Sequence, residues 1–195
     1  MNSYYILNKP YGYLSQFTDE GRFKGLNHLI KVASDIYSVG RLDADSEGLL
    51  ILTNDNALKH RILEPSNEHI RTYAVQVEGA VNNESLLSLK QSVQINVNGK
   101  LYKTKPAKNV TILKEVNFPE RNPPVRFRKA VSTSWIQLSL TEGKNRQVRK
   151  MTAAIGFPTL RLIRVAIEDL LLENINTGEV VEMDKKTIYK LLKLS

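Results

Sequence analysis

The hydrophobic pattern centres on an uninterrupted apolar run from Gly48 to Leu52. Five consecutive residues of this kind are typical of a strand buried on both faces, although periodicity alone does not exclude a helix. A short acidic segment, Asp43 to Glu47, comes directly before the run, and Arg41 adds a cation beside it. The pattern predicts a carboxylate-bearing loop at the mouth of a buried strand, which is either a solvated turn or a reactive site.

Residues with helix-capping side chains follow the same run. Thr53, Asn54 and Asp55 all have side chains that accept hydrogen bonds from the free backbone amides at the start of a helix. We interpret Asn54 and Asp55 as the caps of an amphipathic helix. This helix is expected to end near Leu63, because Pro65 prevents its continuation.

Alternation of apolar and polar residues predicts most of the other elements. Ile70 to Glu78 alternates well, with Tyr73 and Val75 on one face of the expected strand. Asn98-Gly99 between two alternating segments favours a hairpin with a type I′ turn. Further strands are expected at residues 4–8, 37–39, 108–116, 134–140, 159–167 and 178–183, and helices at residues 26–32, 83–92, 144–155 and 185–194. Strands outnumber helices and short turns join them, which predicts an α+β domain on a largely antiparallel sheet.

Composition excludes several classes of function. The 195 residues suffice for one large or two small domains, and they include no cysteine, so disulfides and cysteine-based metal sites are ruled out. The three histidines do not stand at metal-ligand spacings. No signal peptide is recognisable and no apolar stretch approaches the roughly 18 residues that span a bilayer, so we expect a cytoplasmic protein without membrane contact. Walker A and Gly-rich dinucleotide motifs are also missing.

Positive charge is concentrated in one part of the chain. The formal net charge is +8, and ten basic residues lie between Arg121 and Val165, where only Glu142 opposes them. Such clustering is the expected footprint of a polyanionic partner, because each neutralised phosphate releases condensed counterions. The alternative is a solvated basic face.

Part of this basic stretch predicts an amphipathic helix from Lys144 to Ile155. Arg146, Arg149 and Lys150 stand at helical spacing on one face, and Val148 lies on the other. The basic face is either solvent-exposed or a contact surface for phosphates. In the second case one guanidinium group is expected to point inward to a carboxylate, which its forked shape matches.

Four segments together resemble motifs of the pseudouridine synthases, in the branch that modifies ribosomal RNA at single sites. They are LNKPYG at residues 7–12, GRLDADSEGLLILTND at 40–55, RTYAVQV at 71–77 and EGKNRQVRKMTAAIGFPTLRLIR at 142–164. The second and fourth are highly specific. NPPVRFRKAVSTSWIQL and GFPTLRLIR look most like a synthase of the large ribosomal subunit.

The resemblance assigns roles residue by residue. The family's catalytic aspartate falls on Asp43, its base-stacking tyrosine on Tyr73, and the basic residue that pairs with the aspartate on Arg149. Val148 matches an aliphatic residue beside the target base, and Arg41 an RNA-inserting residue of relatives. On residue pattern alone, Tyr73 is better explained as a core aromatic side chain. The other substrate-binding candidates are basic: Lys144, Arg146, Lys150 and Arg128.

The resemblance also implies the fold and the reaction. The expected fold is α+β, a mixed, mainly antiparallel sheet with a central catalytic cleft and flanking helices. One catalytic domain is expected over residues 1–195, without a separate N-terminal RNA-binding domain, since Tyr4 already begins the catalytic fold. The implied reaction is the aspartate-dependent isomerisation of one uridine to pseudouridine, without metal or cofactor. The implied enzyme is a monomer that acts on 23S ribosomal RNA or a pre-50S particle. The alternatives are another rRNA or tRNA site, and a non-catalytic RNA-binding assembly factor.

Overall fold

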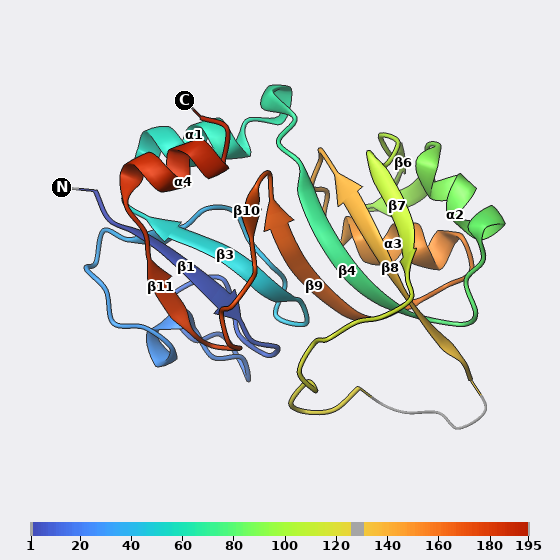
Figure 1. Cartoon of the computed structure of the whole chain (residues 1–195), viewed down its shortest axis with the longest axis horizontal. Coiled ribbons are helices and arrows are strands. Elements are labelled where there is room, and N and C mark those ends of the chain that lie inside the picture. Colours follow the sequence, from blue (N-terminus) through green and yellow to red (C-terminus); the bar gives the residue numbers. More distant parts are fainter. Residues whose placement is uncertain (1, 126–130, 195) are drawn as a thin grey trace. The chain divides into compact units, whose positions relative to one another are not determined.

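The structure, a computed structural model, describes residues 2–125 and 131–194, which form two compact units (Figure 1). Unit 1 comprises the chain up to His69 and from Ile163 onward, and unit 2 comprises Ile70–Leu162. The expectation of a single catalytic domain stays a prediction. No helix in the described part of the chain combines the length and apolar character needed to cross a bilayer.

Unit 1 is built on a mixed sheet. Its strands are β1 (Tyr4–Lys9), β2 (Tyr37–Ser38), β3 (Glu47–Thr53), the end of β9 (Thr159–Ile167), β10 (Leu170–Leu171) and β11 (Val180–Glu182). The strand order is β11-β1-β3-β9, with β2 on β3 and β10 on β9. Only β3 and β9 pair in parallel among these strands, and the other pairs are antiparallel. The predicted α+β class with a mixed, mainly antiparallel sheet is therefore confirmed.

Every residue of β3 is buried, as the apolar run predicts. Leu49 and Ile51 pack with the helices α1 (Asn56–Leu63) and α4 (Lys185–Leu191), whereas Leu50 and Leu52 belong to a second core cluster. Because alternate side chains of a strand point to opposite faces, the two clusters cover both faces of β3. Figure 1 shows α1 and α4 near the end of β3.

Two short 3-10 helices complete unit 1, η1 (Leu26–His28) and η2 (Pro65–Asn67). The helix expected over residues 26–32 is thus only one turn long. Beyond it, Ile30 and Val32 still pack against the second core cluster, but in irregular backbone. Both side chains are β-branched, which lowers their preference for a helix.

Asp55, and not Asn54, caps α1. One carboxylate oxygen of Asp55 accepts hydrogen bonds from the backbone amides of Ala57, at 3.0 Å, and Leu58, at 3.2 Å. The side chain of Asn54 instead accepts a bond from the backbone amide of Ser3 and donates one to Asp35. The assignment of Asn54 as a cap was wrong because its side chain faces other segments of unit 1.

The second carboxylate oxygen of Asp55 joins three elements of unit 1. It accepts hydrogen bonds from the hydroxyl groups of Tyr4 in β1, at 2.7 Å, and Tyr189 in α4, at 2.8 Å. Burial alone would raise the pKa of Asp55, but these two hydrogen bonds outweigh it and hold the pKa at about 2. The ionised carboxylate therefore stabilises unit 1 more than an ordinary cap would.

We expect Asp55→Asn to lower the free energy of unfolding by about 2 kcal/mol at pH 7. The folded-state pKa is lower than the value of about 3.9 in the unfolded chain, so the carboxylate stabilises the fold above about pH 4. This contribution is lost as the pH falls towards about 2. Asp55→Asn should therefore lower the free energy of unfolding by a smaller amount at pH 3 than at pH 7. Urea unfolding at both pH values measures the difference. Asp184→Asn, which removes the charge of the exposed cap of α4 but keeps an acceptor oxygen, is the control, and equal losses in both variants would contradict a role for the tyrosine contacts.

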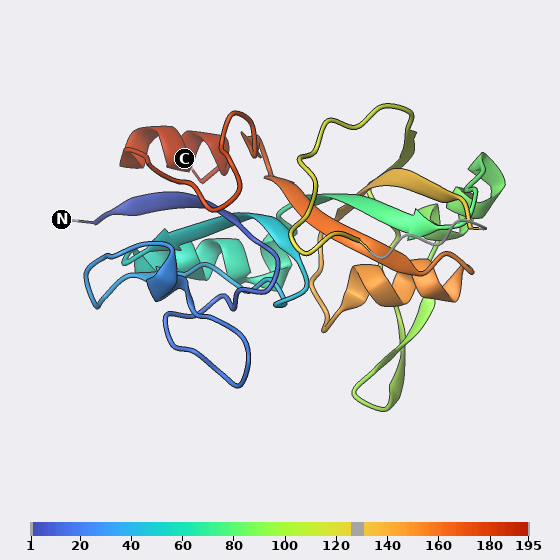
Figure 2. The ribbon, with the colours of Figure 1, turned by 90° about the horizontal axis from the view of Figure 1, so that it is seen from below.

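Unit 2 combines a mainly antiparallel sheet with a separate hairpin. Its strands are the start of β9, β4 (Arg71–Glu78), β8 (Thr133–Leu140) and β7 (Asn109–Leu113), in the order β9-β4-β8-β7. The hairpin consists of β5 (Gln94–Val97) and β6 (Lys100–Lys103), and the helices are α2 (Asn83–Lys90) and α3 (Gln147–Ala154). Figure 2 shows α3 against one face of the sheet, where Val148 and Met151 join its core cluster.

The turn of the β5–β6 hairpin is of the predicted type. Val97 pairs with Lys100, which leaves two residues in the turn. Both have positive φ angles, 51° at Asn98 and 82° at Gly99. Positive φ at both central positions defines a type I′ turn, so the prediction from the Asn-Gly pair is confirmed.

Candidate active site

Asp43 lies in the loop that leads into β3, and its side chain is half-buried. The backbone amide of Ser46 donates a hydrogen bond of 3.0 Å to the carbonyl of Asp43 and closes a turn. Glu47, which the sequence pattern placed in this loop, is instead the first residue of β3 and is only 4% exposed. The acidic loop is therefore one residue shorter than predicted, because the strand begins before the apolar run does.

The turn at residues 9–15 holds this loop on both sides of Asp43. The hydroxyl of Ser15 donates to the carbonyl of Leu42 and accepts from its amide, each at 2.9 Å. The amide of Gly12 donates to the carbonyl of Ala44 at 2.7 Å. Three backbone groups of the residues that flank Asp43 are thus bound by one turn, which restricts where the carboxylate lies.

The side chain of Lys9 stabilises the same turn from inside the protein. This side chain is fully buried, and the amine donates to the carbonyls of Pro10, at 3.0 Å, and Tyr13, at 2.6 Å. Burial lowers the pKa of Lys9 to about 7, although nearby carboxylates, Glu47 foremost, act in the opposite direction. A neutral amine still has donors for both carbonyls. The Lys-Pro-Tyr-Gly segment is therefore a structural support of the acidic loop.

In unit 2, Glu142 organises the segment that enters α3. Its carboxylate accepts hydrogen bonds from the hydroxyl of Tyr102, at 2.6 Å, from the backbone amide of Lys105, at 2.8 Å, and from the side chain of Gln147. Gln147 in turn accepts a bond of 2.8 Å from the backbone amide of Lys144. The acidic residue of the basic stretch thus binds neutral donors of the hairpin and of α3.

These contacts explain why α3 begins at Gln147 and not at Lys144. Arg146 has a φ of 52°, in the left-handed region, and precedes the first helical residue. The prediction that Arg146 shares a helical face with Arg149 and Lys150 was therefore wrong. The side chain of Gln147 accepts a hydrogen bond from the backbone amide of Lys144, and the turn that this bond closes replaces the expected first turn of the helix.

The remaining predicted site residues of unit 2 are on β4 and α3. Tyr73 is partly buried on β4 and packs against the core cluster, to which the buried Val148 of α3 belongs. Arg149 is half-buried and donates a long bond of 3.5 Å to the carbonyl of Thr159. Lys150 donates to the side chain of Asn145 at 3.3 Å.

The predicted catalytic residues are divided between the two units. Asp43 and the exposed Arg41 belong to unit 1, and Tyr73 and Arg149 belong to unit 2. The pairing of Asp43 with Arg149 stays a prediction, and Arg128 lies outside the described residues. Within residues 2–125 and 131–194, no three His, Cys, Asp or Glu side chains come together in a way that could hold a metal ion.

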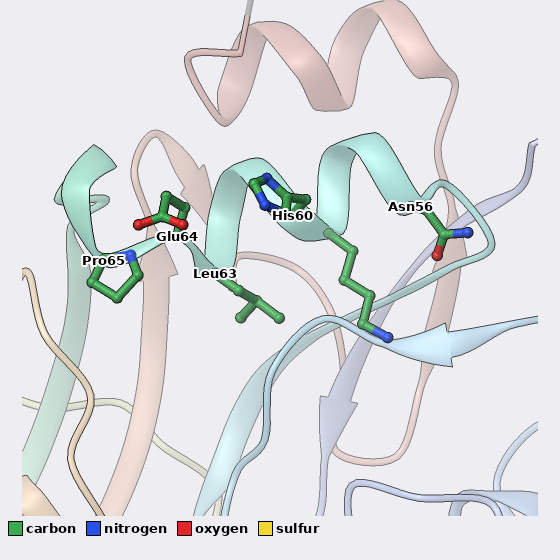
Figure 3. A pocket seen from close by; sticks show the side chains of 6 residues that line it. Asn56, His60, Leu63, Glu64 and Pro65 are labelled. Atoms are coloured by element: carbon green, nitrogen blue, oxygen red, sulfur yellow. The ribbon is translucent and has the colours of Figure 1, made fainter.

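A hollow of about 360 Å³ lies on α1 and the turn that follows it, and Figure 3 shows side chains that line it. Glu64, at its rim, already accepts hydrogen bonds from the amide and the hydroxyl of Ser66. The described residues that line the hollow do not include the predicted catalytic side chains, so it is not the predicted active site. They are Asn56, Lys59, His60, Leu63, Glu64 and Pro65.

A family profile described as RNA pseudouridylate synthase matches residues 3–154. The chain belongs to this family. "Ribosomal large subunit pseudouridine synthase E" of Vibrio vulnificus is 48% identical to this synthase, over 91% of this chain and 74% of the relative. The protein of the same name from Xanthomonas axonopodis pv. citri is 49% identical, over 84% of this chain and 85% of the relative. Among solved structures, "Crystal structure of pseudouridylate synthase" is similar with a TM-score of 0.79 and 27% identity, covering 98% of this chain and 74% of that chain.

Family membership confirms the resemblance carried by the four motifs. This pseudouridylate synthase is an enzyme that isomerises uridine in RNA to pseudouridine. Sequence reasoning missed Ser15 and Lys9 as supports of the loop and Gln147 as the residue that positions α3. The sole signal for Glu142 was that it is the one acidic residue in a basic stretch.

We expect Ser15→Ala to lower kcat about 10-fold and to leave KM for RNA unchanged. The hydroxyl fixes the residue before Asp43, and a displacement of about 1 Å at a reacting group costs about 100-fold in rate. Thr53→Val is the matched control, because the Thr53 hydroxyl also donates to a carbonyl and accepts from an amide, but at the opposite end of β3. Steady-state kinetics of both variants, at equal fractions folded, measure the effect. A similar kcat in the two variants would show that Ser15 only stabilises the fold.

Proposed function

We propose that this synthase converts one uridine of large-subunit (23S) ribosomal RNA to pseudouridine. The identity of 48% and 49% to two proteins named large-subunit synthase E, over most of each chain, supports this substrate. The enzyme acts in the cytoplasm as a monomer, on free 23S RNA or on a pre-50S particle, and without a cofactor.

Asp43 is the proposed catalytic carboxylate. In the reaction the bond between C1′ and N1 breaks, the uracil turns, and C5 bonds to C1′. C5 then loses its proton and N1, released from the sugar, gains one, so that the product is an isomer. An ionised Asp43 serves either to attack C1′ or to remove a proton from the sugar. Arg149 is the proposed cationic partner of this carboxylate, because a nearby opposite charge stabilises the ionised form.

The target base must leave its stack before the bond can break, which costs about a few kcal/mol. Tyr73 offers a ring on which the uracil stacks, and Val148 an apolar neighbour. Arg41 is exposed beside the acidic loop, and we assign it to fill the gap that the flipped base leaves in the RNA. Contacts of phosphates with Lys144, Arg146, Lys150 and Arg128 would offset the cost of unstacking.

The test is a single-turnover reaction with protein-free 23S RNA, a pre-50S particle, 16S RNA and transfer RNA, followed by chemical mapping of pseudouridine and by filter binding of the same samples. One modified uridine in 23S RNA is expected. Modification confined to 16S or transfer RNA would overturn the proposed substrate. Modification of a pre-50S particle alone would identify the particle as the substrate. Tight binding with no modification of any substrate would favour the assembly factor.

Tyr73→Phe should lower kcat about 100-fold and leave RNA affinity unchanged, because the ring remains while the hydroxyl that relays a proton is removed. Tyr73→Ala should also weaken binding, since stacking of a base on an aromatic ring contributes about 1–3 kcal/mol. Single-turnover kinetics and filter binding measure the two effects. Equal behaviour of the two variants would exclude the proton-relay role.

A further inference from the structure

A second lysine-rich segment lies outside the basic stretch of residues 121–165. From Ser85 to Lys114 the sequence contains six lysines and no aspartate or glutamate. The β5–β6 hairpin lies in the middle of this segment, and its lysines, Lys100 and Lys103, have exposed side chains. Sequence analysis identified this hairpin by its turn and assigned it no function.

The two faces of the hairpin differ in character. Ile95 is buried in the core cluster of unit 2, and its cross-strand partner Tyr102 packs against the same cluster. The neighbouring cross-strand pairs point to the opposite face, because side chains alternate along a strand. This outer face consists of four exposed residues, the pairs Gln94–Lys103 and Asn96–Leu101. Leu101 is 78% exposed, which is unusual for a large apolar side chain between lysines.

The hairpin adjoins the segment that enters α3. The amine of Lys144 lies 5.0 Å from the centre of the Tyr102 ring, and β5 packs beside α3. The carboxylate of Glu142 accepts hydrogen bonds from Tyr102 and from the amide of Lys105. Lys144, before the start of α3, thus lies beside the hairpin in unit 2, and Figure 2 shows the hairpin extending beyond α3.

We propose that the outer face of the β5–β6 hairpin, together with the exposed Lys100 beside its turn, binds the phosphate backbone of the substrate RNA. Lys100 and Lys103 would each neutralise a phosphate, and the amides of Gln94 and Asn96 would donate hydrogen bonds to phosphate or ribose oxygens. Leu101 packs on a ribose at the same contact. The inference rests on the proposed function, because it takes RNA as the ligand, and it adds a binding surface to the residues already assigned.

The test compares two double variants with equal net charge. Lys100→Gln/Lys103→Gln alters the hairpin, and Lys186→Gln/Lys190→Gln removes two exposed lysines of α4 in unit 1. We measure filter binding to protein-free 23S RNA between 50 and 200 mM salt, together with turnover. Each phosphate contact contributes about 0.7–0.9 to the slope of log K against log salt. For the hairpin variant the slope should therefore fall by about 1.4–1.8, with Kd and KM about 10-fold higher near 100 mM salt and kcat unchanged.

The control variant should bind with a slope and a Kd within about twofold of the wild type. Equal Kd values and slopes in the two variants would overturn the hairpin surface, because the effect would then follow net charge alone. Turnover by the wild type in the same samples tests the proposed function separately. Failure of the wild type to modify 23S RNA would refute the substrate, whereas a difference between the variants concerns only the hairpin.

Discussion

Asp43→Asn is expected to lower the single-turnover rate of pseudouridine formation by about 10⁴-fold or more. Asparagine has nearly the shape of aspartate but neither the charge nor the basicity of a carboxylate, so it can act neither as nucleophile nor as base. The loop itself should stay in place, since Ser15 and Gly12 hold it through hydrogen bonds to Leu42 and Ala44. Affinity for RNA should therefore change by less than about threefold, as measured by filter binding.

The control for this prediction is Asp45→Asn, in the same loop. Asp45 is half-buried like Asp43, and we interpret it as a residue that structures the loop, so its variant should retain activity within about 10-fold of the wild type. Asp43→Glu should fail almost as completely as Asp43→Asn, because one added methylene displaces the carboxylate by about 1 Å or more. Near-normal turnover by either Asp43 variant, or equal losses at Asp43 and Asp45, would refute the assignment.

The second large effect is expected at Gly48, the second residue of β3. Its φ is +102°, and a Cβ atom there would lie 2.3 Å from the carbonyl oxygen and 2.9 Å from the nitrogen of Arg164. Gly48 and Arg164 are register partners in the parallel β3–β9 pair, so the obstacle is backbone that cannot move without separating the strands. We expect Gly48→Ala to destabilise the protein by about 4 kcal/mol.

Thermal unfolding measures this effect, and for a chain of this size the midpoint should fall by about 10 °C. Gly99→Ala is the matched control, because Gly99 also has a positive φ, +82°, but a Cβ atom there would meet nothing within 4 Å. It should lose only about 1 kcal/mol, the cost of a side chain in the left-handed region. Equal losses at the two glycines would show that backbone conformation, and not the contact with Arg164, makes Gly48 necessary.

Local pattern accounts for the elements that were predicted well. Five consecutive apolar residues predict a strand buried on both faces, and β3 is one. Asn98-Gly99 predicts a type I′ turn, and this turn is observed. These features depend on backbone preferences and burial over a few neighbouring residues, which a sequence shows directly. The catalytic assignments came from the four motifs, whose residue types and order also lie in the sequence.

Contacts between distant segments account for the predictions that failed. Asn54 and Asp55 are equally good caps by residue type, and the choice falls on Asp55, whose second oxygen binds hydroxyl groups 51 and 134 residues away. Similarly, α3 begins late because Gln147 is held by Glu142, which the β5–β6 hairpin also contacts.

The sequence by itself therefore determined the family, the reaction and the identity of the carboxylate proposed to carry it. Only the tertiary structure decided what holds that carboxylate in place. Ser15 and Lys9 support its loop through backbone carbonyls and amides. Any residue supplies such groups, so no residue pattern marks the partner, and folding alone brings donor and acceptor together.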